Sequence, residues 1–335
     1  MKSIFSFKSL IIAAIVVLLV GCGNSHRCHI KSGNVVPVEV ARFDSVIPQY
    51  VASEDTAVLH SIMRDAGRFW GIYNYHLLML SDMPYFKQGL AAFLNDSVVS
   101  QLYADSQHAF ADMSQEENEL AVVAARFRQL FPDQPNPQFQ AHISAMRVPV
   151  ITVDSLVSIS IDTYLGDHYE GYRGRYNNYE LRYHNRDRMI IDVAEVLLRN
   201  AVVHPGGKTL LDDMVYEGRI LYLLSGLLGD DDPMKLFAYS DEELEWCEKN
   251  ETRVWKKMIE QGDLFTTDAM TKNKYINPAP FTAPLSQNAP ARIGRWVGYR
   301  IVQQYIERNN LTPEQIAHDS IYHVEILRLS GYNNR

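Results

Sequence analysis

The spacing of apolar residues along the chain predicts many helices and one short group of strands. Apolar positions recur with helical spacing in the first part, then change to shorter runs typical of strands, and then return to helical spacing. The predicted helices cover residues 54–80, 84–94, 96–110, 114–130, 187–204, 208–228, 240–255, 290–309 and a last segment from 312. The predicted strands cover residues 140–146, 149–153 and 156–161. The pattern therefore predicts an α+β protein that is predominantly helical, with a helical N-terminal layer, a short sheet and a central helix pair.

Local motifs support several of these boundaries. Ser114 with Glu117, and Ser240 with Glu243, have the spacing of capping boxes. Residues 156–161 alternate in polarity, which predicts a strand with one buried face. Gly294 and Gly298 are four residues apart, so they lie on one face of the predicted helix and suit a close approach between two helices.

The N-terminus predicts export and lipidation. Two lysines precede an apolar run over residues 10–20, and Leu19-Val20-Gly21-Cys22 has the order of a lipobox. The run is too short to span a bilayer. We predict a lipoprotein signal peptide over 1–21, a lipid on Cys22 and a flexible, polar tether over 22–34. The alternative is an ordinary signal peptide in which Cys22 has no role.

The mature chain is predicted to form a single globular domain over residues 35–335, with a helical part at 54–131 and a strand and helix part at 139–335. The formal net charge of the whole chain is −8, and no basic patch is present, which argues against a nucleic-acid partner. Cys28 and Cys247 could form a disulfide in an oxidising compartment. Alternatively, Cys247 is a small apolar core residue.

The helix pair 187–204 and 208–228 resembles the central helices of gluzincin zinc peptidases. In those enzymes a His-Glu-x-x-His helix supplies two zinc ligands and a glutamate on the next helix supplies the third. Glu217-Gly218 resembles the third-ligand turn, but no two histidines of this chain are four residues apart. Asp192, Glu195 and Glu217 could instead form a carboxylate cluster, which suits a hard cation. The alternative is a structural role, in which Glu195 and Glu217 pair with Arg199 or Arg219.

A tyrosine-rich loop follows the predicted sheet at residues 167–185. Tyrosine and arginine are enriched in binding hot spots, so this loop is a candidate recognition surface for a glycan or a partner protein. Its candidate residues are Tyr169, Tyr172, Arg173, Arg175 and Tyr176. The alternative is a loop that packs on the helical layer.

An ordered set of motifs resembles the gliding-motility lipoprotein GldB family. The set consists of Arg42-Phe43-Asp44, residues 161–166, residues 213–222, Tyr239-Ser240 with Trp246-Cys247, Asn250-Glu251 and Trp255, Ala279-Pro280-Phe281, and residues 294–302. The resemblance implies an envelope lipoprotein linked to gliding and to the associated secretion machinery. It supplies no catalytic residue, no metal ligand and no cofactor. No aspartate follows Cys22, which favours the periplasmic face of the outer membrane.

Three functions are therefore compatible with the sequence. The first is a non-catalytic, peptidase-like lipoprotein that acts through protein partners in the envelope. The second is a divergent metal-dependent peptidase or hydrolase that uses Asp192, Glu195, Glu217 and a histidine such as His168 or His184. The third is a lipid-anchored binder of glycans or peptides.

Overall fold

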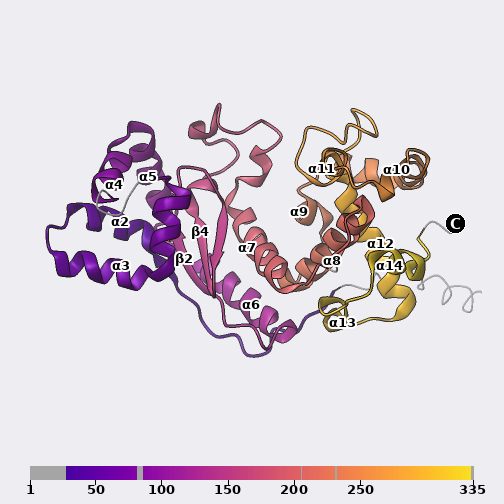
Figure 1. The fold of residues 1–335 in the computed structure, drawn as a ribbon, viewed down its shortest axis with the longest axis horizontal. Coiled ribbons are helices and arrows are strands. Elements are labelled where there is room, and N and C mark those ends of the chain that lie inside the picture. The colour runs from indigo at the N-terminus through magenta and orange to yellow at the C-terminus, as the bar shows by residue number, and fades with distance from the viewer. Residues whose placement is uncertain (1–27, 81–85, 205, 231, 333–335) are drawn as a thin grey trace, which may run out of the picture.

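The computed structural model describes residues 28–80, 86–204, 206–230 and 232–332. The predicted signal peptide and Cys22 lie outside the described residues. The molecule is elongated, with the N-terminal helices at one end, the sheet beside them and the C-terminal helices at the other end (Figure 1). The described part of the chain is mostly helical with one small sheet, as the sequence predicts.

The N-terminal layer contains five helices and a π-helical turn within the described residues. They are α2 (Phe43–Ala52), α3 (Thr56–Gly71), η1 (Ile72–Leu77), α4 (Phe86–Asn95), α5 (Ser97–Ala109) and α6 (Ser114–Leu130). Helix α2 was not predicted, and Pro48 lies inside it. Helix α5 begins as expected, because the Asp96 side chain accepts hydrogen bonds from the backbone of its first turn.

The sheet has four strands in the order β1-β2-β4-β3, namely β1 (Val40–Arg42), β2 (Gln138–His142), β3 (Val150–Val153) and β4 (Leu156–Ser160). The first three strands in this order run parallel, and β3 pairs antiparallel with β4 at the edge. The prediction of one buried face for 156–161 is wrong. Ser158 and Ser160 are fully buried, because both faces of β4 are covered.

The remaining helices form the other half of the molecule. They are α7 (Arg186–Ala201), α8 (Leu210–Leu228), α9 (Pro233–Phe237), α10 (Asp241–Glu260), α11 (Ala269–Ile276), α12 (Ile293–Asn309), α13 (Pro313–Ala317) and α14 (His323–Ser330). The predicted capping box at Ser240 and Glu243 is present at the start of α10. Helix α11 lies in a stretch that the sequence did not predict as helical.

Helix α8 lies at the centre of this half and is buried along nearly all of its length. Its closest neighbour is α12, and Gly298 permits the contact, since a Cβ atom there would lie 1.7 Å from the carbonyl oxygen of Met214. Gly294 faces Tyr275 on α11 instead, so the two glycines serve contacts with different helices. Among the described residues, no helix is both long and apolar enough to cross a membrane.

The predicted capping box at Ser114 is wrong, although helix α6 begins there. The Glu117 carboxylate accepts a hydrogen bond from the backbone N–H of Val40 on β1. The Ser114 side chain makes no cap hydrogen bond, and the Asp112 side chain accepts from the Ser114 N–H. A tertiary contact thus takes the carboxylate that the local motif would use.

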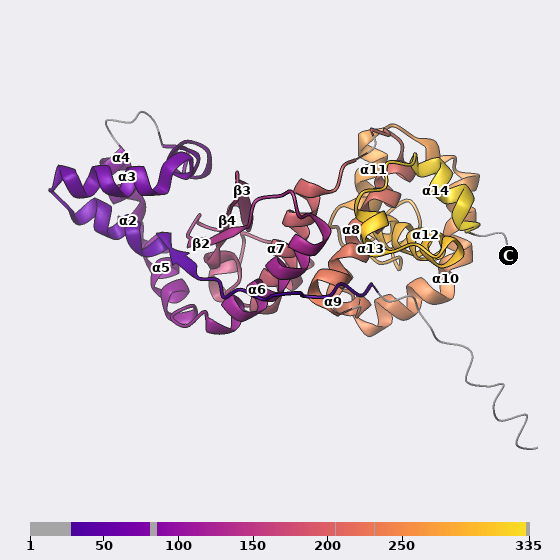
Figure 2. The same cartoon turned by 90° about the horizontal axis from the view of Figure 1, so that it is seen from below.

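The N-terminal segment is also packed more tightly than predicted. The described chain begins near α8 and runs beside α6 to reach β1 (Figure 2). Cys28 and Ile30 are 8% and 3% exposed, and both contact the Gly226 position of α8. Within the predicted tether over 22–34, the described part begins at Cys28 and is anchored to α8 through Cys28 and Ile30, while its flexibility stays a prediction.

Candidate functional site

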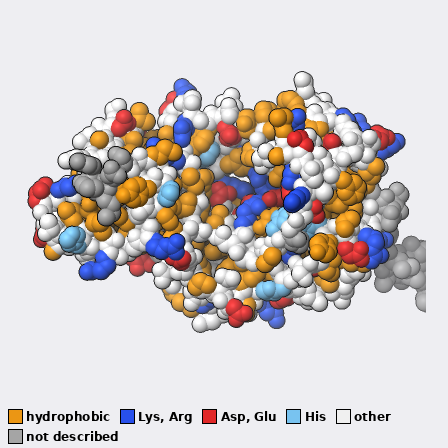
Figure 3. Space-filling model, viewed as in Figure 1, with side chains coloured by type: hydrophobic (Ala, Val, Ile, Leu, Met, Phe, Trp, Pro, Cys, Tyr) orange, Lys and Arg blue, Asp and Glu red, His pale blue; other side chains and the backbone are white. Residues whose placement is uncertain are grey.

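The middle of the molecule contains a cleft with a high density of charged side chains. Figure 3 shows a hollow between the sheet half and the C-terminal helices, where acidic and basic side chains gather. A cavity of about 340 Å³ lies there, lined by the edge strand β3, the tyrosine loop, helix α7, Pro278 and Arg292. The carboxylates of Asp192 and Glu195 are both part of its wall.

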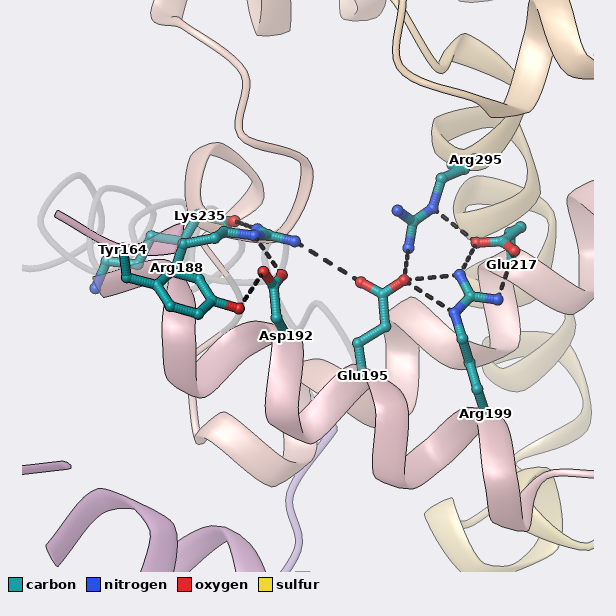
Figure 4. A network of polar contacts seen from close by, with 8 residues as sticks. All are labelled: Tyr164, Arg188, Asp192, Glu195, Arg199, Glu217, Lys235 and Arg295. Carbon is teal, nitrogen blue, oxygen red and sulfur yellow. Dashed lines mark hydrogen bonds and ion pairs between the residues drawn. The ribbon is translucent and has the colours of Figure 1, made fainter. Parts of the chain in front are cut away.

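Glu195 of α7 and Glu217 of α8 are held together by shared arginines (Figure 4). Arg199 Nη2 lies 2.7 Å from Glu195 Oε1 and 2.7 Å from Glu217 Oε2. Arg295 of α12 lies 2.9 Å from Glu195 Oε1 and 2.8 Å from Glu217 Oε2. We call these four residues the arginine–carboxylate cluster. The predicted pairing of Glu195 and Glu217 with Arg199 is thus present.

Arg219, the alternative arginine partner, does not pair with these glutamates. Arg219 points away from both glutamates, and its guanidinium donates hydrogen bonds to the carbonyl oxygens of Ile316 and Asp319. Arg295 takes that place, a pairing that local spacing in the sequence does not predict.

Asp192 lies one helical turn before Glu195 but has different partners. Its carboxylate accepts a hydrogen bond from the Tyr164 hydroxyl at 3.0 Å and forms an ion pair with Arg188 at 2.9 Å. Arg188 also lies 3.7 Å from Glu195 Oε2 and donates to the backbone carbonyl of Lys235. Arg188 therefore connects Asp192 to the arginine–carboxylate cluster (Figure 4).

The electrostatics of the cluster favour ionised carboxylates. Burial alone would raise the pKa of Glu195, but the nearby guanidinium groups, led by Arg199, outweigh burial and lower that pKa. Arg295 is only 1% exposed, so its charge depends on the two glutamates for compensation. A buried ion-pair cluster with this geometry fixes the relative positions of α7, α8 and α12.

The histidines considered as metal ligands do not join these carboxylates. The His168 side chain is 97% exposed on the tyrosine loop. His184 donates from Nδ1 to the Thr163 carbonyl oxygen and stacks on Tyr176, with ring centroids 3.7 Å apart. Within the described ranges, no group of three or more His, Cys, Asp and Glu side chains has the arrangement to hold a metal ion.

The tyrosine loop combines buried and exposed side chains. Tyr172 is 1% exposed, and its hydroxyl donates to the Asp162 carbonyl oxygen, so it is a core residue. Tyr169 donates to the Asp105 carboxylate, and Tyr176 donates to the Met146 carbonyl oxygen. Arg173 and Arg175 are exposed. The candidate recognition surface is therefore smaller than the sequence predicts, and only Tyr176 of its predicted members also lines the central cavity.

Cys28 and Cys247 do not pair in the structure; both are buried free thiols. Burial raises the pKa of Cys28 to about 12. Cys247 is completely buried, as expected for an apolar core residue.

These observations define a mostly helical α+β protein whose central helices are joined by a buried arginine–carboxylate cluster beside an open cavity. The family model for gliding motility protein GldB matches residues 24–334. The chain therefore belongs to the GldB family of gliding motility proteins, as the motif resemblance predicted. No curated protein and no solved structure matches the chain.

Proposed function

We propose that this protein is a lipid-anchored, non-catalytic component of the envelope machinery for gliding and the associated protein secretion. Family membership supports the link to gliding. One observation carries the non-catalytic part: the carboxylate oxygens of Glu195 and Glu217 all face guanidinium groups. A metal ion would have to displace these arginines before it could bind. The role of the cluster in this proposal is to hold helices α7, α8 and α12 together.

The likeness of α7 and α8 to the helix pair of gluzincin peptidases belongs to the same proposal. It rests on a sheet followed by two long helices, with Glu217-Gly218 on the second helix. In this role Arg199 and Arg295 pair with Glu217, the residue that corresponds to the third zinc ligand in that likeness, and the fold serves to bind other proteins.

Metal content and stability of Glu217→Gln test the non-catalytic role. We expect the variant to lose about 3 kcal/mol of unfolding free energy, because it leaves the buried guanidinium of Arg295 and the partly buried one of Arg199 undercompensated. We also expect the purified protein to bind neither zinc nor manganese stoichiometrically. Stoichiometric metal that is lost in Glu217→Gln, together with loss of a peptidase activity at unchanged stability, would establish the hydrolase instead.

The lipid anchor is proposed from the lipobox and tested at Cys22. The Cys22→Ala variant should accumulate as unmodified precursor and lose its membrane association in detergent partitioning. Protease treatment of intact and of permeabilised cells then locates the wild-type protein. Digestion only after permeabilisation is the expected result for the periplasmic face of the outer membrane.

Deletion of the gene tests the cellular role. Loss of gliding or of protein secretion, restored by the wild-type gene and by Arg64→Gln, is the expected result. Arg64 is a suitable control because it is exposed on α3. A deletion strain with normal gliding and secretion but impaired glycan use would contradict the proposal and favour the glycan-binding alternative.

A further inference from the structure

One arginine in the wall of the central cavity forms no ion pair with the carboxylates that the structure describes. Within the described residues, Arg188, Arg199 and Arg295 each form ion pairs with at least one of Asp192, Glu195 and Glu217. Arg292 also lines the cavity, but no described carboxylate lies within ion-pair distance of it. Arg292 is therefore an arginine of the wall that forms no ion pair with a described carboxylate.

The surroundings of Arg292 leave part of its hydrogen-bonding capacity unused. Its Nε atom is buried without a hydrogen-bond partner. Its guanidinium lies 5.4 Å from the ring centroid of Tyr183, so an aromatic face orients it. Glu180, the other acidic side chain in the wall, accepts hydrogen bonds from the Asn177 backbone and amide. A planar guanidinium held in this way is suited to a carboxylate ligand.

The backbone at Arg292 is also unusual. Arg292 precedes α12 with φ of 59° and ψ of 25°, a left-handed conformation that is costly for a residue with a long side chain. Strained residues of this kind persist where the surrounding structure holds them, and they cluster at ligand sites. Arg292 combines this conformation with a side chain in the wall of the cavity.

The free edge of the sheet forms another part of the cavity wall. Pro149 and Val150 line it, and β3 is the terminal strand beside β4. The Ser160 N–H donates to the Pro149 carbonyl oxygen, so the alternate residues Pro149, Ile151 and Val153 direct their backbone groups to β4.

It follows that Val150 and Thr152 direct their N–H and C=O groups away from the sheet. No hydrogen bond to these four groups occurs among the described residues. An unpaired strand edge of this kind binds an extended peptide by adding it as a further strand.

We propose that the cavity is a binding site for an extended peptide segment of a partner protein, which pairs with β3 and places a carboxylate on Arg292. The carboxylate belongs either to the C-terminus of the segment or to an aspartate or glutamate within it. Tyr176 and His184, stacked on each other in the same wall, contact the side chains of the segment. The inference rests on the proposed function in protein contacts and names the contact surface.

The test uses the full-length lipoprotein in detergent and a library of random decapeptides in two chemical forms, with a free C-terminal carboxylate or a C-terminal amide. Enriched peptides are synthesised, and their affinity is measured by fluorescence anisotropy. We expect at least a tenfold loss of affinity in Arg292→Gln and a smaller loss in Arg292→Lys, which keeps the charge. Arg64→Gln should bind as the wild type does.

Backbone methylation of the peptide tests the pairing with β3 without changing the protein. Methylation of a peptide nitrogen should reduce affinity at every second residue and have little effect at the residues between, because only alternate N–H groups face β3. Binding of the carboxylate form alone would assign the contact to the C-terminus. Equal binding of amidated peptides that contain aspartate or glutamate would assign it to a side chain.

Three results would overturn the inference: no enrichment of any peptide, equal affinity in wild type and Arg292→Gln, or a methylation effect without alternation. None of them depends on the deletion phenotype. A gliding or secretion defect in the deletion strain would then uphold the proposed function while the peptide site is rejected.

Discussion

Two buried carboxylate clusters of this protein are stabilised in opposite ways. Asp162, at the end of β4, is surrounded by neutral donors: the backbone N–H groups of Ser144 and Met146 and the Ser160 hydroxyl, at 3.2, 2.6 and 2.5 Å. Glu195, in the arginine–carboxylate cluster, is surrounded by guanidinium groups. Burial raises the pKa of Asp162, whereas the arginines lower the pKa of Glu195.

The two clusters also differ in what they connect. All donors to Asp162 come from a short stretch of chain, and they hold a turn in which Ala145 and Met146 have positive φ. The donors to Glu195 come from α7 and from α12, about a hundred residues later. Neutral donors thus stabilise a local turn here, while full charges join distant helices. Only the second arrangement lies beside a further guanidinium, that of Arg292, which forms no ion pair with a described carboxylate.

The largest effect is expected when a buried cation is removed from the arginine–carboxylate cluster. Arg295→Met leaves Glu195 and Glu217 with less positive charge in a buried site and should cost about 3–5 kcal/mol of unfolding free energy. Urea unfolding followed by circular dichroism measures this loss. An unchanged midpoint would show that the cluster does not hold the helices together.

A smaller loss of unfolding free energy is expected at Asp162, whose hydrogen-bond donors are neutral. Asp162→Asn replaces one acceptor oxygen by an amide donor, which then faces an N–H or hydroxyl group. Leaving a buried donor unpaired costs about 1–3 kcal/mol. The same unfolding experiment should show a loss smaller than that of Arg295→Met. A loss of equal or greater size would mean that the neutral donors around Asp162 contribute as much to the unfolding free energy as the arginine–carboxylate cluster does.

The opposite pKa shifts predict opposite effects of pH. Glu195 has a folded pKa below its usual 4.5. Its ionisation therefore contributes to the unfolding free energy above about pH 4.5, and this contribution is lost as the pH falls through the folded pKa. Asp162 has a folded pKa above its usual 3.8. Its contribution to the unfolding free energy therefore decreases as the pH rises from 3.8 through the folded pKa.

Relative to wild type, acidification from pH 7 to 4 should therefore destabilise Glu195→Gln less and Asp162→Asn more. Urea midpoints at pH 7, 5 and 4 measure the two slopes. Parallel slopes for both variants would remove the electrostatic distinction between the clusters.

The smallest effect is expected at an exposed ion pair. Arg68 and Asp154 lie 2.7 Å apart, but their side chains are 73% and 65% exposed, so solvent screens the interaction. Arg68→Ala should change the unfolding free energy by less than about 1 kcal/mol. A loss as large as that of Arg295→Met would contradict the view that burial, rather than ion pairing itself, makes the central cluster important.

The sequence predicted the parts of this structure that depend on local spacing. The long helices around Glu195 and Glu217 were found from apolar periodicity, and the link between Glu195 and Arg199 follows from their separation of four residues. The predicted family was confirmed by the match over nearly the whole chain.

Long-range contacts could not be predicted in this way. Arg295 lies a hundred residues from Glu195, and its segment resembled a simple helix-packing motif. Glu117 matched a capping box, but β1 uses its carboxylate. Ser158 suggested an exposed face, but it is fully buried and bonds His142. In each case a polar side chain found a partner that is distant in sequence, and a single sequence contains no signal for such pairs.

The burial of Cys28 and Ile30 against α8 limits the distance between the protein and a bilayer. With a lipid on Cys22, six residue steps separate the acylated position from a side chain fixed in the core. Even fully extended, such a stretch covers only about 20 Å. The body of such an acylated protein would stay within a few nanometres of the lipid headgroups.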